Sequence, residues 1–255
     1  MKLGFIGTGK IASSVIIGIS QSKIKYKKIF ISNRNIKIAN SLKKKFKKIE
    51  ISKTNQKIID NSDWIFLSIT PSVGNKIIKH LNFKSNQKVI SFISTITLAQ
   101  LKKMIKKKVD LVRAIPLPPI SLKEGPIPIC PPNKEVKAFF NKLGSVVEIK
   151  NEKLSINFWS TSGMMASYYH MLDTMSAWLN KKGVKKLDAQ KYITSLFLAL
   201  SKEAVINSNK DLRLLVKDSQ TPKGLNEQGL KEMIKKDVFK SVTNTLNSIY
   251  KRLDK

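Results

Sequence analysis

Hydrophobic positions in the first 149 residues form short runs that alternate with amphipathic stretches. The runs predict buried strands, and apolar residues spaced by three and four positions predict helices between them. Strands that alternate with helices are typical of a parallel sheet covered on both faces. The predicted strands are 2–6, 28–32, 63–69, 88–93, 109–115 and 146–149, and the predicted helices are 10–21, 36–46, 72–80, 98–105 and 135–143.

From about residue 152 the strand-like runs stop and long helical patterns follow, which predict helices 152–181, 188–207, 226–235 and 238–253. The chain thus divides into an α/β domain, residues 1–150, and an all-α domain, residues 151–255. A helical domain of this size can bury only a small core. We therefore expect it to pack against a second copy of the chain.

The first predicted strand leads directly into a glycine-rich turn. Gly7 permits a tight turn, Gly9 lets the backbone approach a pyrophosphate, and Ala12 allows the next helix to pack close to the strand. That helix then presents free N–H groups and its positive dipole end to phosphates. A strand before the turn and a helix after it predict a Rossmann-like dinucleotide-binding domain. The cofactor contacts expected here are Gly7, Thr8, Gly9, Lys10 and Ile11.

The second predicted strand ends at Ser32-Asn33-Arg34. A site for NADH would place Asp or Glu here to hold both ribose hydroxyls, and this segment has neither. Ser32 and Asn33 can donate hydrogen bonds to a 2′-phosphate, and Arg34 can pair with it. The segment therefore favours NADPH over NADH as the cofactor.

Three later loops also follow predicted strands at their carboxyl ends, where ligands of open α/β sheets bind. The last of these loops holds three prolines that stiffen it, and we expect the preceding Arg113 to anchor it. The further cofactor contacts predicted from these loops are Ile69, Thr70, Pro71, Ser94 and Pro116.

Two segments of the helical domain place small and polar residues at the start of a helix. At the first, around Gly163, free N–H groups can meet an anionic substrate. The second is the Pro/Gly turn at residues 221–224. Thr221 within it, or Asn226 just after it, can cap the helix that follows. This second segment allows two interpretations: a capped helix start without function, or a polar cluster directed at a substrate.

The net charge of +31 raises the possibility of a nucleic acid or an anionic membrane as partner. Only four of the 48 basic residues are arginine, whereas nucleic-acid sites favour arginine interleaved with aromatic residues. No apolar run approaches the ~18 residues of a membrane span. We expect neither a nucleic-acid nor a membrane partner.

The chain has one cysteine, Cys130, so no intramolecular disulfide can form. This agrees with a reducing compartment, and we expect a cytoplasmic protein. Cys130 lies among prolines and is interpreted as a small apolar filler rather than a nucleophile. We expect no metal site.

Taken in order, these landmarks resemble the pyrroline-5-carboxylate reductase family over nearly the whole chain. The segments that carry the resemblance are LGFIGTGKIA (3–12), SNR (32–34), SITP (68–71), ISFIST (90–95), RAIPLPP (113–119), SGMMASY (162–168) and LRLLVKDSQTPKGLN (212–226).

The resemblance implies NADPH-dependent reduction of a cyclic imine, with 1-pyrroline-5-carboxylate reduced to L-proline. NADPH would deliver hydride to the imine carbon while a hydrogen-bond donor assists at the imine nitrogen. Asn226 stands where the family has its donor threonine and keeps a donor NH₂ group. Backbone N–H groups of the two C-terminal motifs would hold the substrate carboxylate, and the helical domains would form a homodimer or larger assembly. The implied catalytic residues are Asn226 and Thr221, and the implied substrate contacts are Ser162, Gly163, Met164, Tyr168, Lys223 and Gly224.

The chain departs from the family pattern mainly on the substrate side. A loop asparagine that orients the nicotinamide is Leu117 here, and a loop lysine is Thr70. Methionines at 164 and 165 are bulkier than the family's residues, and Lys223 replaces a glycine. These changes can reshape the pocket for another imine, and Lys223 can add a partner for a carboxylate.

Two alternative functions remain open from the sequence. A β-hydroxyacid dehydrogenase also joins a Rossmann domain to helices, but its helical lysine is missing here, because no Lys follows Gly163 before Lys181. A non-catalytic paralogue that binds NADP(H) is the second alternative, and the altered residues Leu117 and Lys223 favour it.

Overall fold

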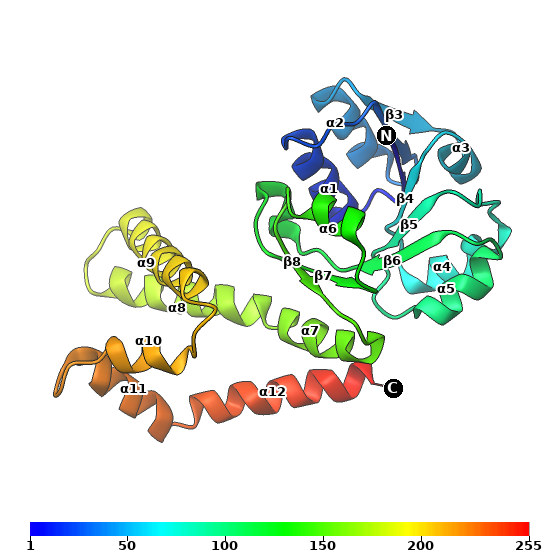
Figure 1. Cartoon of the computed structure of the whole chain (residues 1–255). Helices are drawn as coiled ribbons and strands as arrows, with labels where there is room; N and C mark the ends of the chain where they lie inside the picture. The colour runs from blue at the N-terminus through cyan, green and yellow to red at the C-terminus, as the bar shows by residue number, and fades with distance from the viewer. Residues whose placement is uncertain (255) are drawn as a thin grey trace. The chain divides into compact units, whose positions relative to one another are not determined.

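The computed structural model describes residues 1–254 and contains two compact units, Met1–Trp159 and Ser160–Lys255 (Figure 1). Unit 1 carries the sheet and unit 2 is helical, as the change of pattern near residue 152 predicts.

Unit 1 contains a single sheet whose strands are β1 (Lys2–Ile6), β2 (Lys28–Ser32), β3 (Ile49–Ser52), β4 (Trp64–Leu67), β5 (Lys88–Ser91), β6 (Asp110–Ala114), β7 (Pro126–Cys130) and β8 (Ser145–Glu148). Their order in the sheet is β3-β2-β1-β4-β5-β6-β7-β8. β1 to β6 pair in parallel, β7 is antiparallel to β6, and β8 is parallel to β7. The order of the first six strands is that of a Rossmann fold, which confirms the predicted fold class.

Helices cover both faces of this sheet (Figure 1). They are α1 (Lys10–Ser20), α2 (Ile36–Lys45), α3 (Asn55–Asp60), α4 (Pro71–Ile77), α5 (Leu98–Ile105) and α6 (Lys134–Phe140), with the 3-10 helices η1 (Ile78–His80), η2 (Pro118–Leu122) and η3 (Glu152–Leu154). One hydrophobic cluster joins the sheet to α1, α2 and α6, and a second joins it to α3 and α5.

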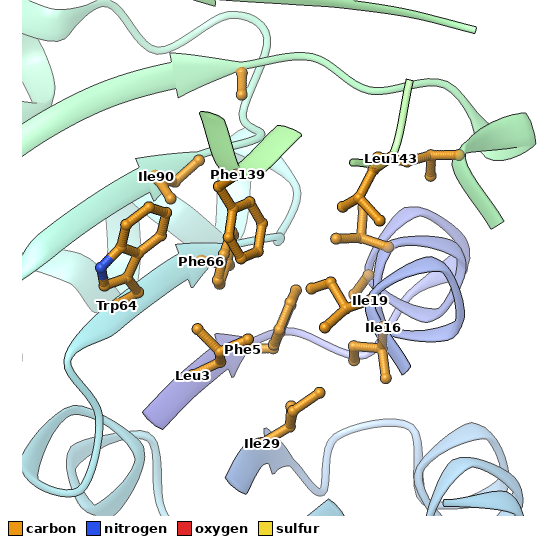
Figure 2. Packing of buried hydrophobic residues seen from close by; sticks show 14 of the residues in the cluster. Leu3, Phe5, Ile16, Ile19, Ile29, Trp64, Phe66, Ile90, Phe139 and Leu143 are labelled. Atoms are coloured by element: carbon orange, nitrogen blue, oxygen red, sulfur yellow. The ribbon is translucent and has the colours of Figure 1, made fainter. Parts of the chain in front are cut away.

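Strand alternation separates the two clusters. Leu3 and Phe5 of β1 belong to the α1 side, whereas Ile6 belongs to the opposite side. On the α1 side the rings of Phe5 and Phe66 stack with centroids 4.4 Å apart, and Phe139 of α6 covers them (Figure 2). β1 and β4 are therefore buried on both faces at the centre of the sheet, which is typical of parallel strands.

Gly18 lets α1 approach η2 closely. A Cβ added at Gly18 would collide with the carbonyl oxygen of Ile120, which is fully buried in η2. This contact fixes the proline-rich loop after β6 against the helix that follows the glycine turn.

Unit 2 consists of helices whose first member, α7 (Ser155–Ser162), begins in unit 1. The others are α8 (Met165–Lys181), α9 (Lys186–Ile206), α10 (Arg213–Asp218), α11 (Leu225–Lys235) and α12 (Val238–Leu253). Within residues 160–254 the buried apolar side chains are Ala189 and Ile193 alone. So small a core does not stabilise a helical domain without further burial.

Several elements differ from the sequence-based prediction. β3 was not predicted, because the short run Ile49–Ser52 includes a glutamate and a serine. The six-residue helix α3 was not predicted either. β7 was not predicted, because Pro126 and Pro128 lack the N–H groups that a strand normally donates. The predicted helix 152–181 is interrupted at Gly163–Met164, and α10 was missed. None of the helices built by residues 1–254 has the length and apolar character needed to cross a membrane.

Replacing Gly18 by alanine should destabilise unit 1 by about 1–3 kcal/mol, because the new methyl group overlaps the Ile120 carbonyl oxygen. Helix propensity alone predicts a gain of about 1 kcal/mol for the same change. Asn40→Ala, at an exposed position inside α2, is the matched control and should stabilise by about 0.5 kcal/mol. Urea unfolding followed by circular dichroism measures both, and a Gly18→Ala protein as stable as the wild type would contradict the close approach.

Candidate functional site

β1 ends in a turn that requires glycine at position 7. Gly7 has φ +102°, and a Cβ added there would overlap the carbonyl oxygen of Ser68. The Ser68 hydroxyl also donates to the Gly7 carbonyl oxygen at 2.9 Å. The turn is therefore held between the ends of β1 and β4, where the strand order reverses and ligands of this fold bind.

α1 begins at this turn without a side-chain cap. Gly9 is the N-cap residue, and no side chain among the described residues accepts a hydrogen bond from the first turn as a cap. A Cβ added at Gly9 would meet nothing within 4 Å, so the space before the helix is open. Bare N–H groups and the positive end of the helix dipole favour an anion there. This cradle fits the pyrophosphate of a dinucleotide.

Ser32 braces the same turn from β2. Its hydroxyl accepts a hydrogen bond from the Gly7 N–H at 3.1 Å, and its carbonyl oxygen accepts one from the Thr8 hydroxyl at 3.1 Å. Both Ser32 and Thr8 are buried. The predicted contact between Ser32 and a 2′-phosphate stays a prediction, whereas Asn33 and Arg34 are exposed beside it.

Two cavities lie along this edge of the sheet and share Gly7, Arg34 and Ile69. The first has a volume of about 440 Å³ and is also lined by Thr8, Gly9, Asn35, Ile36, Lys37, Ser68 and Thr70. The second has a volume of about 340 Å³ and is also lined by Ile6, Ser32, Asn33, Lys53, Thr54, Asn55, Val73 and Ile77. Together they form a groove from the glycine turn past Arg34 to the end of β3.

The groove thus gathers most of the residues predicted after the first strand, all three predicted after the second, and part of those predicted from the later loops. It also includes residues that the sequence analysis missed, chiefly Ser68, Asn35 and the segment 53–55. Segment 53–55 follows β3, so it was missed together with that strand. Predicted residues outside both linings are Lys10, Ile11, Pro71, Ser94 and Pro116.

The loops after β4, β5 and β6 differ in what they expose. Thr70 is exposed at the N-cap of α4, and its hydroxyl lies 3.3 Å from that of Ser72. Ser94 is half-buried and its carbonyl oxygen accepts a hydrogen bond from Arg113. Pro116 is buried. The predicted contact of Pro116 with a cofactor therefore lacks an exposed ring surface.

In unit 2, Ser162 ends α7 and Gly163 with Met164 forms the break before α8. The N–H groups of Gly163 and Met164 donate to the carbonyl oxygens of Ser160 and Thr161, both at 3.1 Å. A Cβ added at Gly163 would lie 3.0 Å from Ile249 Cδ1, so glycine lets α12 pack here. The break therefore has a structural role of its own.

The turn at residues 221–224 is tight. Lys223 is in the left-handed region with φ +60°, and the Gly224 N–H donates to the Thr221 carbonyl oxygen at 2.8 Å. The turn brings four predicted residues together: Thr221, Lys223, Gly224 and Asn226. Asn226 Nδ2 donates to the Ser219 carbonyl oxygen at 2.8 Å, which leaves its second amide hydrogen for another acceptor.

Glu227 closes this turn from α11. Its carboxylate accepts a hydrogen bond from the Lys223 N–H at 2.5 Å and pairs with Lys231 at 2.6 Å. The hydrogen bond from Lys231, followed by that from Lys223, lowers the pKa of the Glu227 carboxyl below its usual range. The ionised Glu227 carboxylate therefore already accepts the hydrogen bond of one N–H group of the turn, that of Lys223.

Cys130 is buried, and burial is the largest cause that raises the pKa of its thiol. A protonated, buried thiol is a poor nucleophile.

Comparisons with known proteins agree with this architecture. The family model described as "NADP oxidoreductase coenzyme F420-dependent" matches residues 2–96, and the model described as "Pyrroline-5-carboxylate reductase dimerisation" matches residues 153–255. The pyrroline-5-carboxylate reductase of Staphylococcus haemolyticus is 22% identical to the chain, over 99% of this chain and 96% of that protein.

Solved structures show the same fold. The pyrroline-5-carboxylate reductase of Streptococcus pyogenes is 23% identical with a TM-score of 0.82, over 99% of this chain and 98% of that one. The Plasmodium falciparum pyrroline carboxylate reductase, solved with NADP bound, is 21% identical with a TM-score of 0.84, over 99% of this chain and 97% of that one.

An N-terminal and a C-terminal part of the chain thus match different family models, and the Staphylococcus haemolyticus reductase aligns across both parts. The ordered motifs of the sequence and the observed strand order point the same way. The chain is a divergent member of the pyrroline-5-carboxylate reductase family.

Proposed function

We propose that this protein reduces 1-pyrroline-5-carboxylate to L-proline in proline biosynthesis with NADPH as the electron donor. The observation that carries the proposal is the uncapped N-terminus of α1 at the Gly7–Gly9 turn, in a chain of this family. Positioning of two bound molecules supplies most of the rate in such a reaction.

The groove of unit 1 would hold the cofactor. The turn Gly7-Thr8-Gly9 and the first N–H groups of α1 would bind its pyrophosphate, with Lys10 and Ile11 at the helix start. Arg34 would pair with the 2′-phosphate. Lys53 lines the second cavity together with Arg34. When bound, NADPH supplies the hydride equivalent that the imine carbon accepts.

Asn226 would act at the imine nitrogen. Its second amide hydrogen can donate a hydrogen bond there, but an amide does not release a proton, so the proton that completes the amine would come from solvent. Thr221, in the same turn, is the other candidate donor. Ser162, Gly163, Met164, Tyr168, Lys223 and Gly224 would surround the substrate.

We propose that residues 1–150 form the NADP-binding domain and that residues 151–255 form the dimerisation and substrate domain. The apolar surface of unit 2 supports a homodimer or larger assembly: Leu187, Val205 and Ile206 on α9 are 78%, 69% and 79% exposed. A partner chain would bury this surface. A cytoplasmic location agrees with the free, buried Cys130.

The proposed reaction is tested by following NADPH oxidation with 1-pyrroline-5-carboxylate, other cyclic imines and 2-oxo acids. We expect turnover with 1-pyrroline-5-carboxylate or a closely related cyclic imine. Tight NADPH binding without turnover of any imine would favour the non-catalytic paralogue. Turnover of 2-oxo acids alone would favour the dehydrogenase.

Arg34→Ala should raise the KM for NADPH about tenfold or more and change that for NADH by less than about twofold, because only NADPH carries the 2′-phosphate. Lys44→Ala is the control, since it removes one charge from α2 outside both cavity linings. Initial rates with each cofactor measure the effect. An equal rise in KM for NADPH and NADH would contradict the assignment of Arg34 to the 2′-phosphate.

Asn226→Ala should lower kcat about tenfold or more with little change in the KM for NADPH, because the donor to the imine nitrogen is lost. Asn226→Thr separates this role from the contact with the Ser219 carbonyl oxygen. A threonine hydroxyl restores a donor, so this variant should keep most of the activity. Loss of activity in both variants would assign Asn226 to the shape of the turn.

A further inference from the structure

Arg113 is a buried charge at the carboxyl end of β6, with 3% of its surface exposed. One terminal nitrogen of its guanidinium donates to a Glu152 carboxylate oxygen, and the other donates to the Ser94 carbonyl oxygen. The guanidinium carbon lies 4.6 Å from the ring centroid of Trp159. The side chain is thus held from η3, from α7 and from the loop between β5 and α5.

Glu152 extends the contact to the other end of that loop. The same oxygen, Oε1, accepts a hydrogen bond from the Leu98 N–H at 2.8 Å. Leu98 is the first residue of α5, so Glu152 satisfies one of the N–H groups that a helix start leaves unpaired. The ion pair therefore holds residues 92–97 both at Ser94 and where the loop joins α5.

The arrangement is not optimised for stability. The Arg113 side chain is buried, whereas that of Glu152 is 26% exposed. Bringing the Arg113 charge out of water costs desolvation that an ion pair often fails to repay, and apolar side chains of similar size can replace such a pair without loss. Arg113 Nε also has no hydrogen-bond partner in the part of the chain that the structure describes. A buried donor without a partner is unfavourable. Apolar side chains in place of Arg113 and Glu152 would lack the hydrogen bonds to the Ser94 carbonyl oxygen and the Leu98 N–H.

We propose that Arg113 and Glu152 are positioning residues, which hold the loop of residues 92–97, with its predicted cofactor contact Ser94, in the conformation that binds NADPH. This inference rests on the proposed NADPH-dependent function. Arg113 and Glu152 need not touch the cofactor, because they act through the Ser94 carbonyl and the Leu98 N–H.

A second ion pair, at the N-terminal ends of β5 and β6, provides a matched control. Lys88 at the start of β5 pairs with Asp110 at the start of β6, and the Lys88 side chain is 9% exposed. The Lys88–Asp110 pair thus lies at the start of β6, whereas Arg113 pairs with Glu152 near the end of the same strand. Asp110→Asn should lower the melting temperature while leaving loop 92–97 and NADPH binding unchanged.

The test compares the wild type with Glu152→Ala, Asp110→Asn and the double variant Arg113→Met/Glu152→Met. Hydrogen–deuterium exchange of peptides covering residues 92–98, the Kd for NADPH and the melting temperature are measured for each. Glu152→Ala should lower the melting temperature, speed exchange in this loop about tenfold and weaken NADPH about tenfold. The double variant should recover the melting temperature but keep the fast exchange and the weak NADPH binding.

A double variant with wild-type exchange and wild-type Kd would overturn the proposal. So would an Asp110→Asn protein that shows the same loop and binding defects, because global destabilisation would then explain them. If the wild type does not bind NADPH, the proposed function fails. The exchange data still decide whether the ion pair orders the loop.

Discussion

The absence of a side chain at Gly7 is the constraint on which the site depends. It lets the Ser68 carbonyl approach the turn, so the ends of β1 and β4 lie close together. Hydroxyl groups of Ser68 and Ser32 then brace the turn from its two neighbouring strands. The N-terminus of α1 is consequently aimed at the point where the strand order reverses. Further along, Gly18 brings the same helix against η2, so α1 also helps to place the loop after β6.

Features coded by neighbouring residues were predicted well, and features that join distant segments were not. The β1–α1 turn, the order of the domains and the start of the groove follow from local spacing. β3 and the segment 53–55 were not predicted because a glutamate and a serine interrupt this four-residue strand, so it does not form a continuous apolar run. The burial of Ser32 follows from its contact with Gly7, 25 residues away. Arg113 was expected to anchor its own loop, but its partners lie at Ser94 and Glu152, which no local pattern reveals.

The helices of unit 2 could be predicted from the sequence, but the surfaces that bury their apolar side chains could not. Its helices follow the predicted pattern, yet the apolar positions that produced the pattern are largely exposed within one chain. The hydrophobic effect that stabilises these helices must then come from surfaces outside the chain. At the turn of residues 221–224, Asn226 and Glu227 are already engaged with Ser219 and Lys223. The polar groups of this turn are therefore held in place, and part of their hydrogen-bonding capacity is already used within the chain.

The division of tasks between Ser32 and its neighbours has an evolutionary consequence. Ser32 is committed to the backbone of the glycine turn, whereas Asn33 and Arg34 are exposed in the groove. Under the proposed assignment, substitutions at Asn33 and Arg34 would change which dinucleotide is preferred and would leave the hydrogen bond between Ser32 and the glycine turn in place. The residues proposed to select the cofactor are thus exposed, whereas the residue that supports the glycine turn is buried, so the two tasks can change independently.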